Sequence, residues 1–251
     1  MKWYTQEYIY WKVRGSPINV NVTDLDISSL NIKTLTNISF ENLHNLQKLN
    51  CSFNELRSLK GIEKMPNLKI LICSHNNLTS LEGIENLNNL TELNCDYNKL
   101  TSLTSLNRIK NSHNLTKLYC LNNSLTSLKG IENLCNLTNL NCSHNKLQLL
   151  DQITNLTNLK ALSCCNNNLQ SLDSIKHLVN LKMLDCSCNK LMSLDQIINL
   201  VNLEYLICSH NQLKSLNGIE KMHNLIELNC ADNNLISLNG IENLINLRSL
   251  C

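Results

Sequence analysis

Leucine, cysteine and asparagine recur along the chain in a fixed pattern that begins near residue 46. The pattern LxxLxCxxNxL occurs nine times, and the copy at Leu137–Leu147 reads LTNLNCSHNKL. Within each copy the second leucine and the cysteine alternate with other residues, which is the period-two signal of a strand with one buried face. Because one short strand recurs in every copy, the pattern predicts a sheet built from stacked repeats.

The first leucines of successive copies lie 22 residues apart, except for one step of 25 residues between Leu90 and Leu115. Too few residues remain after each strand for a long helix, so we expect extended or 3₁₀-like connections. The three extra residues fall around Ser105–Lys110 and should bulge on the convex side or at an edge. Neighbouring strands would stack ~4.8 Å apart, so ten of them would form a sheet roughly 45–50 Å long.

These repeats resemble the leucine-rich repeat family. The motif SLxGIExLxNLxxL, as in Ser80–Leu93, is most similar to the 22-residue subclass of internalins and of a phosphatase-1 regulatory subunit. The resemblance implies an α/β-class solenoid, mostly β with short 3₁₀ or irregular convex segments. It would form a right-handed horseshoe or arc with a parallel β-sheet on its concave face. The usual activity of the family implies a scaffold for protein–protein interaction.

Residues 1–20 precede the repeats, and we expect them to cap the first coil. They contain Trp3, Tyr4, Tyr8, Tyr10 and Trp11, which are five of the ten aromatic residues in the chain. The first coil of a stack exposes an apolar face that must be covered, so a cap explains them better than a separate recognition motif. The solenoid would then occupy residues 21–251 as about 11 coils, with the last one incomplete.

The sequence stops at Leu250-Cys251, inside a strand motif and without a polar terminal cap. Such a coil would leave apolar surface and an unpaired strand edge. We expect either that another molecule covers this end, self-association being one way to do so, or that the sequence is a fragment.

Two rows of asparagine recur with the coils, and stacking would make each row a ladder. An amide has two donor hydrogens and an acceptor, so it can satisfy backbone groups where the strand bends away. We interpret both rows as structural rather than as carbohydrate or nucleotide sites. The second row precedes each first leucine, from Asn45 to Asn246. The first row is Asn54, Asn76, Asn98, Asn123, Asn145, Asn167, Asn189, Asn211 and Asn233.

Cysteine occupies the inward strand position in nine coils, from Cys51 to Cys230, where we expect it to act as a small apolar filler. Disulfides between coils are not expected, because in-register Cβ atoms lie a strand spacing apart, beyond the usual ~3.8 Å. The thirteen cysteines of the chain suit a reducing compartment. Cys165 and Cys188 are the thiols expected to face solvent, and chance explains them better than redox chemistry.

The convex segment varies between coils. We predict that its glycine position does not require a positive φ, because other residues replace glycine there. The glycines are Gly61, Gly83, Gly130, Gly218 and Gly240, and the replacements are Gln152, Ser174 and Gln196.

No catalytic motif is present: the chain has no phosphate-binding glycine loop, no HExxH and no GxSxG. His75, His144 and His210 each precede a ladder asparagine. They lie at least ~14 Å apart by strand spacing, too far to share a metal, and we interpret them as solvated surface residues. We therefore expect no enzymatic activity, no cofactor and no metal.

The formal net charge of +2 comes from 22 basic and 20 acidic residues. This balance predicts no strong attraction to nucleic acid or to an anionic membrane. The chain has no apolar run of about 18 residues that would cross a bilayer, and its N-terminus lacks the apolar core of a secretory signal. The simplest prediction is a cytoplasmic protein.

Function should depend on the outward residues of the strands, which form the concave surface. Apolar and aromatic residues grouped among polar ones are typical of protein interfaces. We predict that two such groups bind a partner protein. The first is Phe53, Ile70, Ile72, Tyr97, Tyr119 and Leu121, and the second is Met183, Tyr205, Ile207 and Ile226.

The alternatives belong to other functional classes. Resemblance to the phosphatase regulator implies a regulatory subunit of an enzyme such as a protein phosphatase. Resemblance to internalins implies a secreted adhesin, which the abundant cysteines and the missing signal sequence oppose. The chain is rich in asparagine, isoleucine and lysine, and in this it also resembles uncharacterised leucine-rich repeat proteins of giant amoeba-infecting viruses. That resemblance would imply interaction with a host cell.

Overall fold

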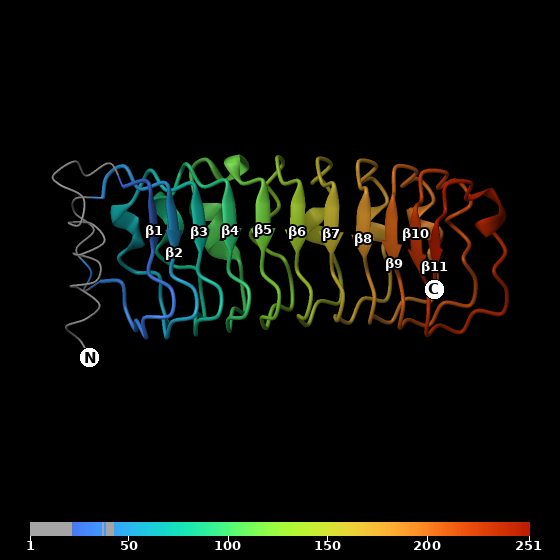
Figure 1. Cartoon of the computed structure of the whole chain (residues 1–251), viewed down its shortest axis with the longest axis horizontal. Helices are drawn as coiled ribbons and strands as arrows, with labels where there is room; N and C mark the ends of the chain where they lie inside the picture. The colour runs from blue at the N-terminus through green and yellow to red at the C-terminus, as the bar shows by residue number, and fades with distance from the viewer. Residues whose placement is uncertain (1–21, 37, 39–42) are drawn as a thin grey trace.

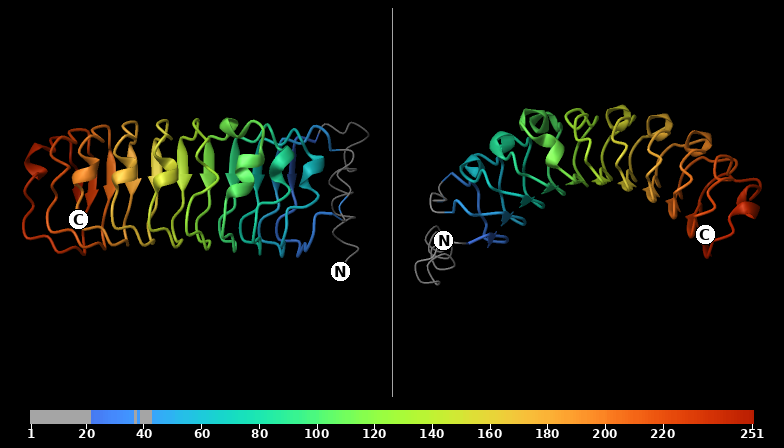
Figure 2. Two further views of the ribbon diagram at one scale, coloured as in Figure 1. Left: turned by 180° about the vertical axis from the view of Figure 1, so that it is seen from behind. Right: turned by 90° about the horizontal axis from the view of Figure 1, so that it is seen from above.

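In the part of the chain that the structure describes, eleven short strands form one sheet in chain order, and every neighbouring pair is parallel. The computed structural model describes residues 22–36, 38 and 43–251, so the expected cap at residues 1–20 lies outside the described residues. The strands are β1 (Asp24–Asp26), β2 (Lys48–Asn50), β3 (Ile70–Ile72), β4 (Glu92–Asn94), β5 (Lys117–Tyr119), β6 (Asn139–Asn141), β7 (Ala161–Ser163), β8 (Met183–Asp185), β9 (Tyr205–Ile207), β10 (Glu227–Asn229) and β11 (Ser249–Leu250). They line the inside of an arc (Figures 1 and 2).

Short 3₁₀ helices lie on the convex side of this arc (Figure 2), and the described part of the chain contains no α-helix. The prediction of 3₁₀-like connections is therefore confirmed. The 3₁₀ helices are η1 (Ile62–Lys64), η2 (Ile84–Asn86), η3 (Thr104–Arg108), η4 (Ser112–Asn114), η5 (Asp151–Ile153), η6 (Asp173–Ile175), η7 (Asp195–Ile197) and η8 (Ile241–Asn243).

The core is a continuous aliphatic column between the sheet and the convex segments. Leu140 and Cys142 of one coil are at most 2% exposed, and the corresponding residues of the neighbouring coils contact them from both sides. Burying a leucine side chain stabilises a protein by about 1.5–3 kcal/mol, and each coil repeats this contribution. The divergent first coil follows the same plan, because Leu25, Ile27 and Leu35 are also buried.

The extra three residues do not disturb the sheet. Leu93 and Leu118 remain partners across β4 and β5, so the strand register continues through the long coil. The additional length forms η3, whose Leu106 is fully buried, and the following Ile109 is 5% exposed. The prediction of a convex bulge is confirmed, and the bulge contributes apolar side chains to the core (Figure 2).

The prediction about glycine is wrong. All five recurring glycines have φ between 102° and 116°, a region that residues with a Cβ rarely adopt. Where Gln152 or Gln196 replaces glycine, the backbone follows another path: η5 and η7 begin two residues before the position of the glycine-led helices. The sequence therefore encodes two convex backbone conformations, and glycine is required in one of them.

Candidate functional site

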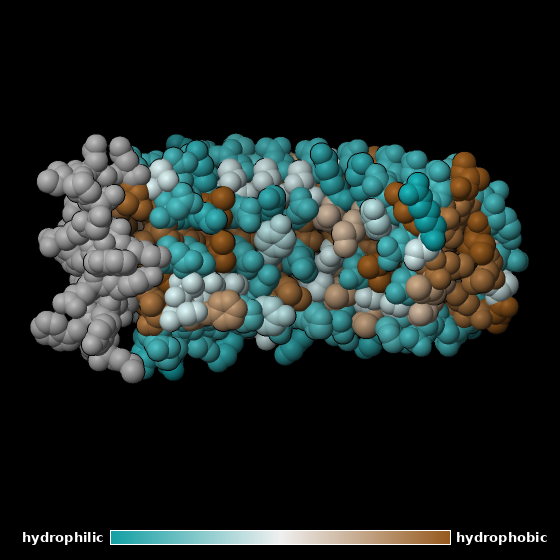
Figure 3. Space-filling model, viewed as in Figure 1, coloured by the Kyte–Doolittle hydropathy of each residue, from teal (hydrophilic) through white to brown (hydrophobic). Residues whose placement is uncertain are grey.

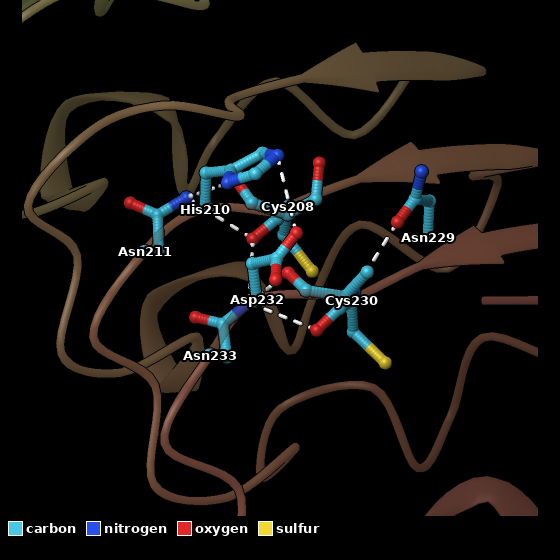
Figure 4. Close-up of polar contacts among 9 residues, drawn as sticks. Cys208, His210, Asn211, Asn229, Cys230, Asp232 and Asn233 are labelled. Atoms are coloured by element: carbon cyan, nitrogen blue, oxygen red, sulfur yellow. Dashed lines mark hydrogen bonds and ion pairs between the residues drawn. The ribbon is translucent and has the colours of Figure 1, made fainter.

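The concave face is held in shape by the first asparagine ladder. Asn233 is representative: its Nδ2 donates to the carbonyl oxygens of Cys208 and Cys230, both at 3.0 Å (Figure 4). Its Oδ1 accepts from Leu213 N–H at 3.0 Å. Each ladder amide thus joins its own coil to the preceding one. Because the bonds end on backbone atoms, this row is structural, as predicted.

The second asparagine row also connects coils, at the edge where the chain returns to the sheet. Asn158 Nδ2, for example, donates to Cys135 O at 2.9 Å, and Asn180 Nδ2 donates to Thr157 O at 2.9 Å. These side chains are exposed and make fewer bonds than those of the first ladder. The prediction that they anchor the returning segment is confirmed.

The cysteine ladder is buried and forms hydrogen bonds. All thirteen cysteines are free thiols, and those in the ladder lie inside the core. Cys95 Sγ donates to Tyr119 O at 3.2 Å, and Cys73 Sγ donates to Asn94 O at 3.3 Å. Burial raises the pKa of the Cys51 and Cys142 thiols to about 12, so these groups stay protonated near neutral pH and are poor nucleophiles.

The remaining thiols are more accessible. Cys165 and Cys188, expected to face solvent, are half-buried, while Cys135 on the return edge and the final Cys251 are exposed. The sequence interpretation missed Cys135, because its coil position shows no fixed residue type. Burial raises the pKa of the Cys165 thiol, so this group is less reactive than a free cysteine.

We predict a two-stage reaction with a thiol reagent such as dithionitrobenzoate. In the native protein Cys135 and Cys251 should react first, and Cys165 and Cys188 more slowly. The nine ladder thiols should react only on unfolding, because burial both excludes the reagent and suppresses the thiolate. Thiol counting in native buffer and in denaturant checks this. More than four reactive thiols in the native protein would contradict the buried ladder.

The residue before each ladder asparagine adopts a left-handed backbone conformation, with φ between 51° and 53° in nine successive coils. We call these residues the left-handed row. Asparagine, aspartate and histidine tolerate this region better than other residues with a Cβ, and several coils use them. The row is Phe53, His75, Tyr97, Asn122, His144, Asn166, Cys188, His210 and Asp232.

Three members of the left-handed row form an aromatic stack. The ring centroids of Phe53 and His75 are 4.2 Å apart, as are those of His75 and Tyr97, and both pairs are within 10° of parallel. Phe53 and Tyr97 remain 56% and 41% exposed. His75 is half-buried between them, so it lies at the surface but is less solvated than the sequence predicts. Stacking of this kind contributes about 0.5–1.5 kcal/mol per pair beyond burial.

The two other predicted surface histidines have polar partners. His144 is exposed, and its Nε2 lies 3.2 Å from Asn166 Nδ2. His210 Nε2 lies 3.3 Å from Asp232 Oδ2 in the next coil (Figure 4). Within the part of the chain that the structure describes, no three His, Cys, Asp or Glu side chains converge as metal ligands.

The first predicted partner-binding group is divided by a polar strand. Ile70 and Ile72 are outward residues of β3, and Tyr119 is an outward residue of β5. Between them β4 presents Glu92 and Asn94. Phe53 and Tyr97 lie three residues beyond the ends of β2 and β4 rather than on the strands. The group is therefore divided into an isoleucine pair, Tyr119 with the following Leu121, and Phe53 with Tyr97 beyond the C-terminal ends of their strands.

Asp96 positions the last member of this group. Its Oδ1 accepts the backbone N–H of Leu121 at 2.7 Å, which fixes the half-buried Leu121 just after β5. Burial raises the pKa of the Asp96 carboxyl to about 6. Serine occupies this position in most other coils, so Asp96 is a local departure next to the apolar residues.

The second group is more compact. Met183 and Tyr205 are direct partners on β8 and β9, with 37% and 39% exposure, and Ile207 is half-buried on β9. Ile226 immediately precedes β10, at the N-terminal end of that strand.

Figure 3 shows that the face carrying the strands is mostly hydrophilic with separate apolar patches. The largest apolar area on this face is at its C-terminal end (Figure 3), and Ile236 and Ile245, near the end of the sequence, are 91% and 80% exposed. The expected association through this end stays a prediction.

Among the described residues, none of the helices has the length and apolar character needed to pass through a membrane.

Comparisons with known proteins agree with this architecture. The family model described as Leucine Rich repeats (2 copies) matches residues 66–108, 157–199 and 201–243, just over half of the chain. A comparison with curated proteins found no match.

Three solved structures illustrate the similarity. A leucine-rich repeat protein of Leptospira interrogans is 32% identical over 92% of this chain and 66% of its own, with a TM-score of 0.82. The functional domain of InlJ from Listeria monocytogenes, described as including a cysteine ladder, is 32% identical over 92% of this chain and 48% of its own, with a TM-score of 0.78. The ectodomain of the Arabidopsis thaliana receptor kinase GASSHO1/SCHENGEN3, in complex with CASPARIAN STRIP INTEGRITY FACTOR 2, is 26% identical over 83% of this chain and 27% of its own, with a TM-score of 0.68.

The present chain thus spans two thirds or less of these proteins. The recurrent motif, the parallel sheet and the family match together show that the chain belongs to the leucine-rich repeat family.

Proposed function

We propose that this chain is a non-catalytic scaffold that binds a partner protein on its concave face. Proteins of this family are typically protein–protein interaction scaffolds. The observation that carries the proposal here is the exposed aromatic stack of Phe53, His75 and Tyr97 beside the isoleucine pair of β3. Exposed aromatic side chains held rigidly are frequent anchors of protein interfaces.

Rigidity supports this mechanism. Each coil is joined to the next by parallel strand pairing and by the two asparagine ladders. Side chains on such a support lose little conformational entropy on binding, so more of the contact energy contributes to affinity. The Arabidopsis complex shows that a related fold binds a protein ligand, which supports the same class of partner for this chain.

The test is affinity capture from the native cell with the double variant Phe53→Ala/Tyr97→Ala. We expect the captured partner to decrease at least tenfold relative to wild type, because truncation of two interface anchors typically costs about 2 kcal/mol or more. The matched control is Leu149→Ala/Met192→Ala, which removes exposed apolar area outside both predicted groups and outside the concave strands. Quantitative mass spectrometry compares the three captures. Undiminished capture by the Phe53/Tyr97 variant would reject the stack as the anchor.

Two finer statements are also proposals. Regulation of an enzyme such as a protein phosphatase rests on the repeat consensus, and phosphatase activity that co-purifies with the chain would support it. A cytoplasmic location is favoured by thirteen free thiols, and fractionation of the native cell tests it.

A further inference from the structure

A groove of about 470 Å³ runs across the N-terminal ends of the neighbouring strands β7 to β11. One wall consists of the residues that immediately precede these strands. We call them the entry row: Lys160, Lys182, Glu204, Ile226 and Arg248. Asparagines of the second ladder form the other wall. The groove thus lies beside the second apolar group of the concave face.

The asparagine side chains of the second wall form hydrogen bonds with the backbone. Asn180 and Asn202 donate through Nδ2 to backbone carbonyl oxygens of the preceding coil, both at 2.9 Å. Asn224 does the same at 3.1 Å. These amides are neutral and their donors are in use, so the charge of the groove comes from the entry row.

The charges of the entry row are not balanced. Lys182 Nζ and Glu204 Oε1 form an ion pair at 2.7 Å, so these two side chains largely neutralise each other. Lys160 and Arg248 are both exposed, and within the described residues neither forms an ion pair. The groove therefore presents one unpaired cation near each end and a neutral pair between them.

An apolar contact lies between the same ends. Ile226 is half-buried and lines the groove between Glu204 and Arg248. Tyr205 and Met183 begin the adjacent strands and are each more than one third exposed. A ligand in the groove would bury apolar surface here and contact cations at both ends.

The spacing of the coils sets the length of the ligand. Lys160 and Arg248 are four coils apart, which is ~19 Å at a strand spacing of ~4.8 Å. An extended peptide advances about 3.3 Å per residue, so about six residues separate the groups that contact the two cations. Ile226 is three coils from Lys160, so an apolar side chain would fit about four residues after the first contact.

We propose that this groove binds an extended acidic segment of a partner protein, with two carboxylates about six residues apart and an apolar side chain between them. The proposal rests on the proposed function and specifies the chemistry of one contact. A dense polyanion such as nucleic acid or a sulfated glycan fits poorly, since the neutral pair of Lys182 and Glu204 at the centre of the groove offers its charges no net attraction. Two carboxylates that flank a neutral centre fit this distribution of charge.

The probe is a fluorescein-labelled peptide, Glu-Ser-Gly-Ser-Leu-Ser-Glu, and its binding is measured by fluorescence anisotropy at low ionic strength. We expect saturable binding that weakens about two- to tenfold in the variant Lys160→Gln/Arg248→Gln, because two exposed ion pairs with the peptide are lost. The control Lys146→Gln/Lys190→Gln changes the net charge equally at exposed positions outside the groove and should bind like wild type.

A second pair of measurements examines the apolar contact. Replacing the leucine of the peptide, its fifth residue, with serine should weaken binding about threefold or more in wild type, and this preference should disappear in Ile226→Ser. All these substitutions are at positions that are exposed or half-buried, and circular dichroism will verify that the variants fold.

Three outcomes would overturn the proposal. They are equal weakening by the groove and control variants, no preference for leucine, and tighter binding of a heparin oligosaccharide that depends on Lys160 and Arg248. The cellular capture with the Phe53/Tyr97 variant does not use the groove. Failure here with success there would reject the groove and leave the proposed function standing.

Discussion

Replacing Asn145 with alanine is expected to lower the free energy of unfolding by roughly 2–4 kcal/mol. Its Nδ2 donates to the carbonyl oxygens of Cys120, Cys142 and Ser143 at 3.0–3.1 Å, and its Oδ1 accepts Leu125 N–H at 2.9 Å. The variant leaves that buried N–H without its acceptor and removes donors shared by two coils. Urea titration followed by circular dichroism measures the change.

Asn158→Ala is the matched control. Asn158 is exposed in the next coil, and its side chain donates to Cys135 O alone. Water can replace this bond, so we expect a loss of about 1 kcal/mol or less. Equal destabilisation by the two variants would show that the first asparagine ladder contributes no more to stability than the second.

Gly218→Ala should destabilise the protein by about 2–5 kcal/mol in total. Gly218 has φ +106°, which costs any residue with a Cβ about 1–2 kcal/mol. In addition, an added Cβ would lie 2.3 Å from Leu194 O and 2.7 Å from Leu194 C, which are backbone atoms of the preceding coil. Those atoms cannot move without breaking the stack of coils.

Two other glycines separate the effect of φ from the effect of contact. At Gly240, φ is +102° but the nearest atom to an added Cβ is Glu220 Cγ at 3.5 Å. Gly240→Ala should therefore cost only the ~1–2 kcal/mol of the backbone conformation. Gly83, with Leu59 C at 3.0 Å, should be intermediate, and it controls for the position of Gly240 near the last strand. If all three unfolding free energies fall equally, close contact is not the reason for glycine at Gly218.

The tight contact at Gly218 arises where the convex path changes. The preceding coil carries Gln196 inside η7, whereas the Gly218 coil turns through positive φ. Gly130 shows the same tight approach, 2.3 Å from Leu103 O, and it follows the long coil with η3. In the sequence, glutamine or serine replaces glycine at this position in three coils. The sequence alone does not show that replacement requires a different backbone in that coil.

The candidate site was only partly visible in the sequence. Met183 and Tyr205 were grouped correctly, because equal coil positions on consecutive strands become direct partners. The sequence places Phe53 and Tyr97 among the outward residues of the strands. In the structure they lie in the turn after each strand, because their left-handed backbone conformation ends the alternation of the strand. The sequence prediction for His75 is a solvated side chain. However, Phe53 and Tyr97 occupy the equivalent positions of the coils before and after it, and this is the signal for a stack.

By itself, the sequence determined the fold, the register and the two ladders, since a 22-residue period leaves one way to bury a leucine column and satisfy the strand ends. Tertiary structure decided what depends on contact between coils. The aromatic stack, the ion pair of Lys182 with Glu204 and the glycines that approach backbone atoms all join residues 22 or more positions apart. Whether such residues are in contact depends on the backbone conformation of each coil. A repeat consensus does not contain this information, because it describes only what the coils share.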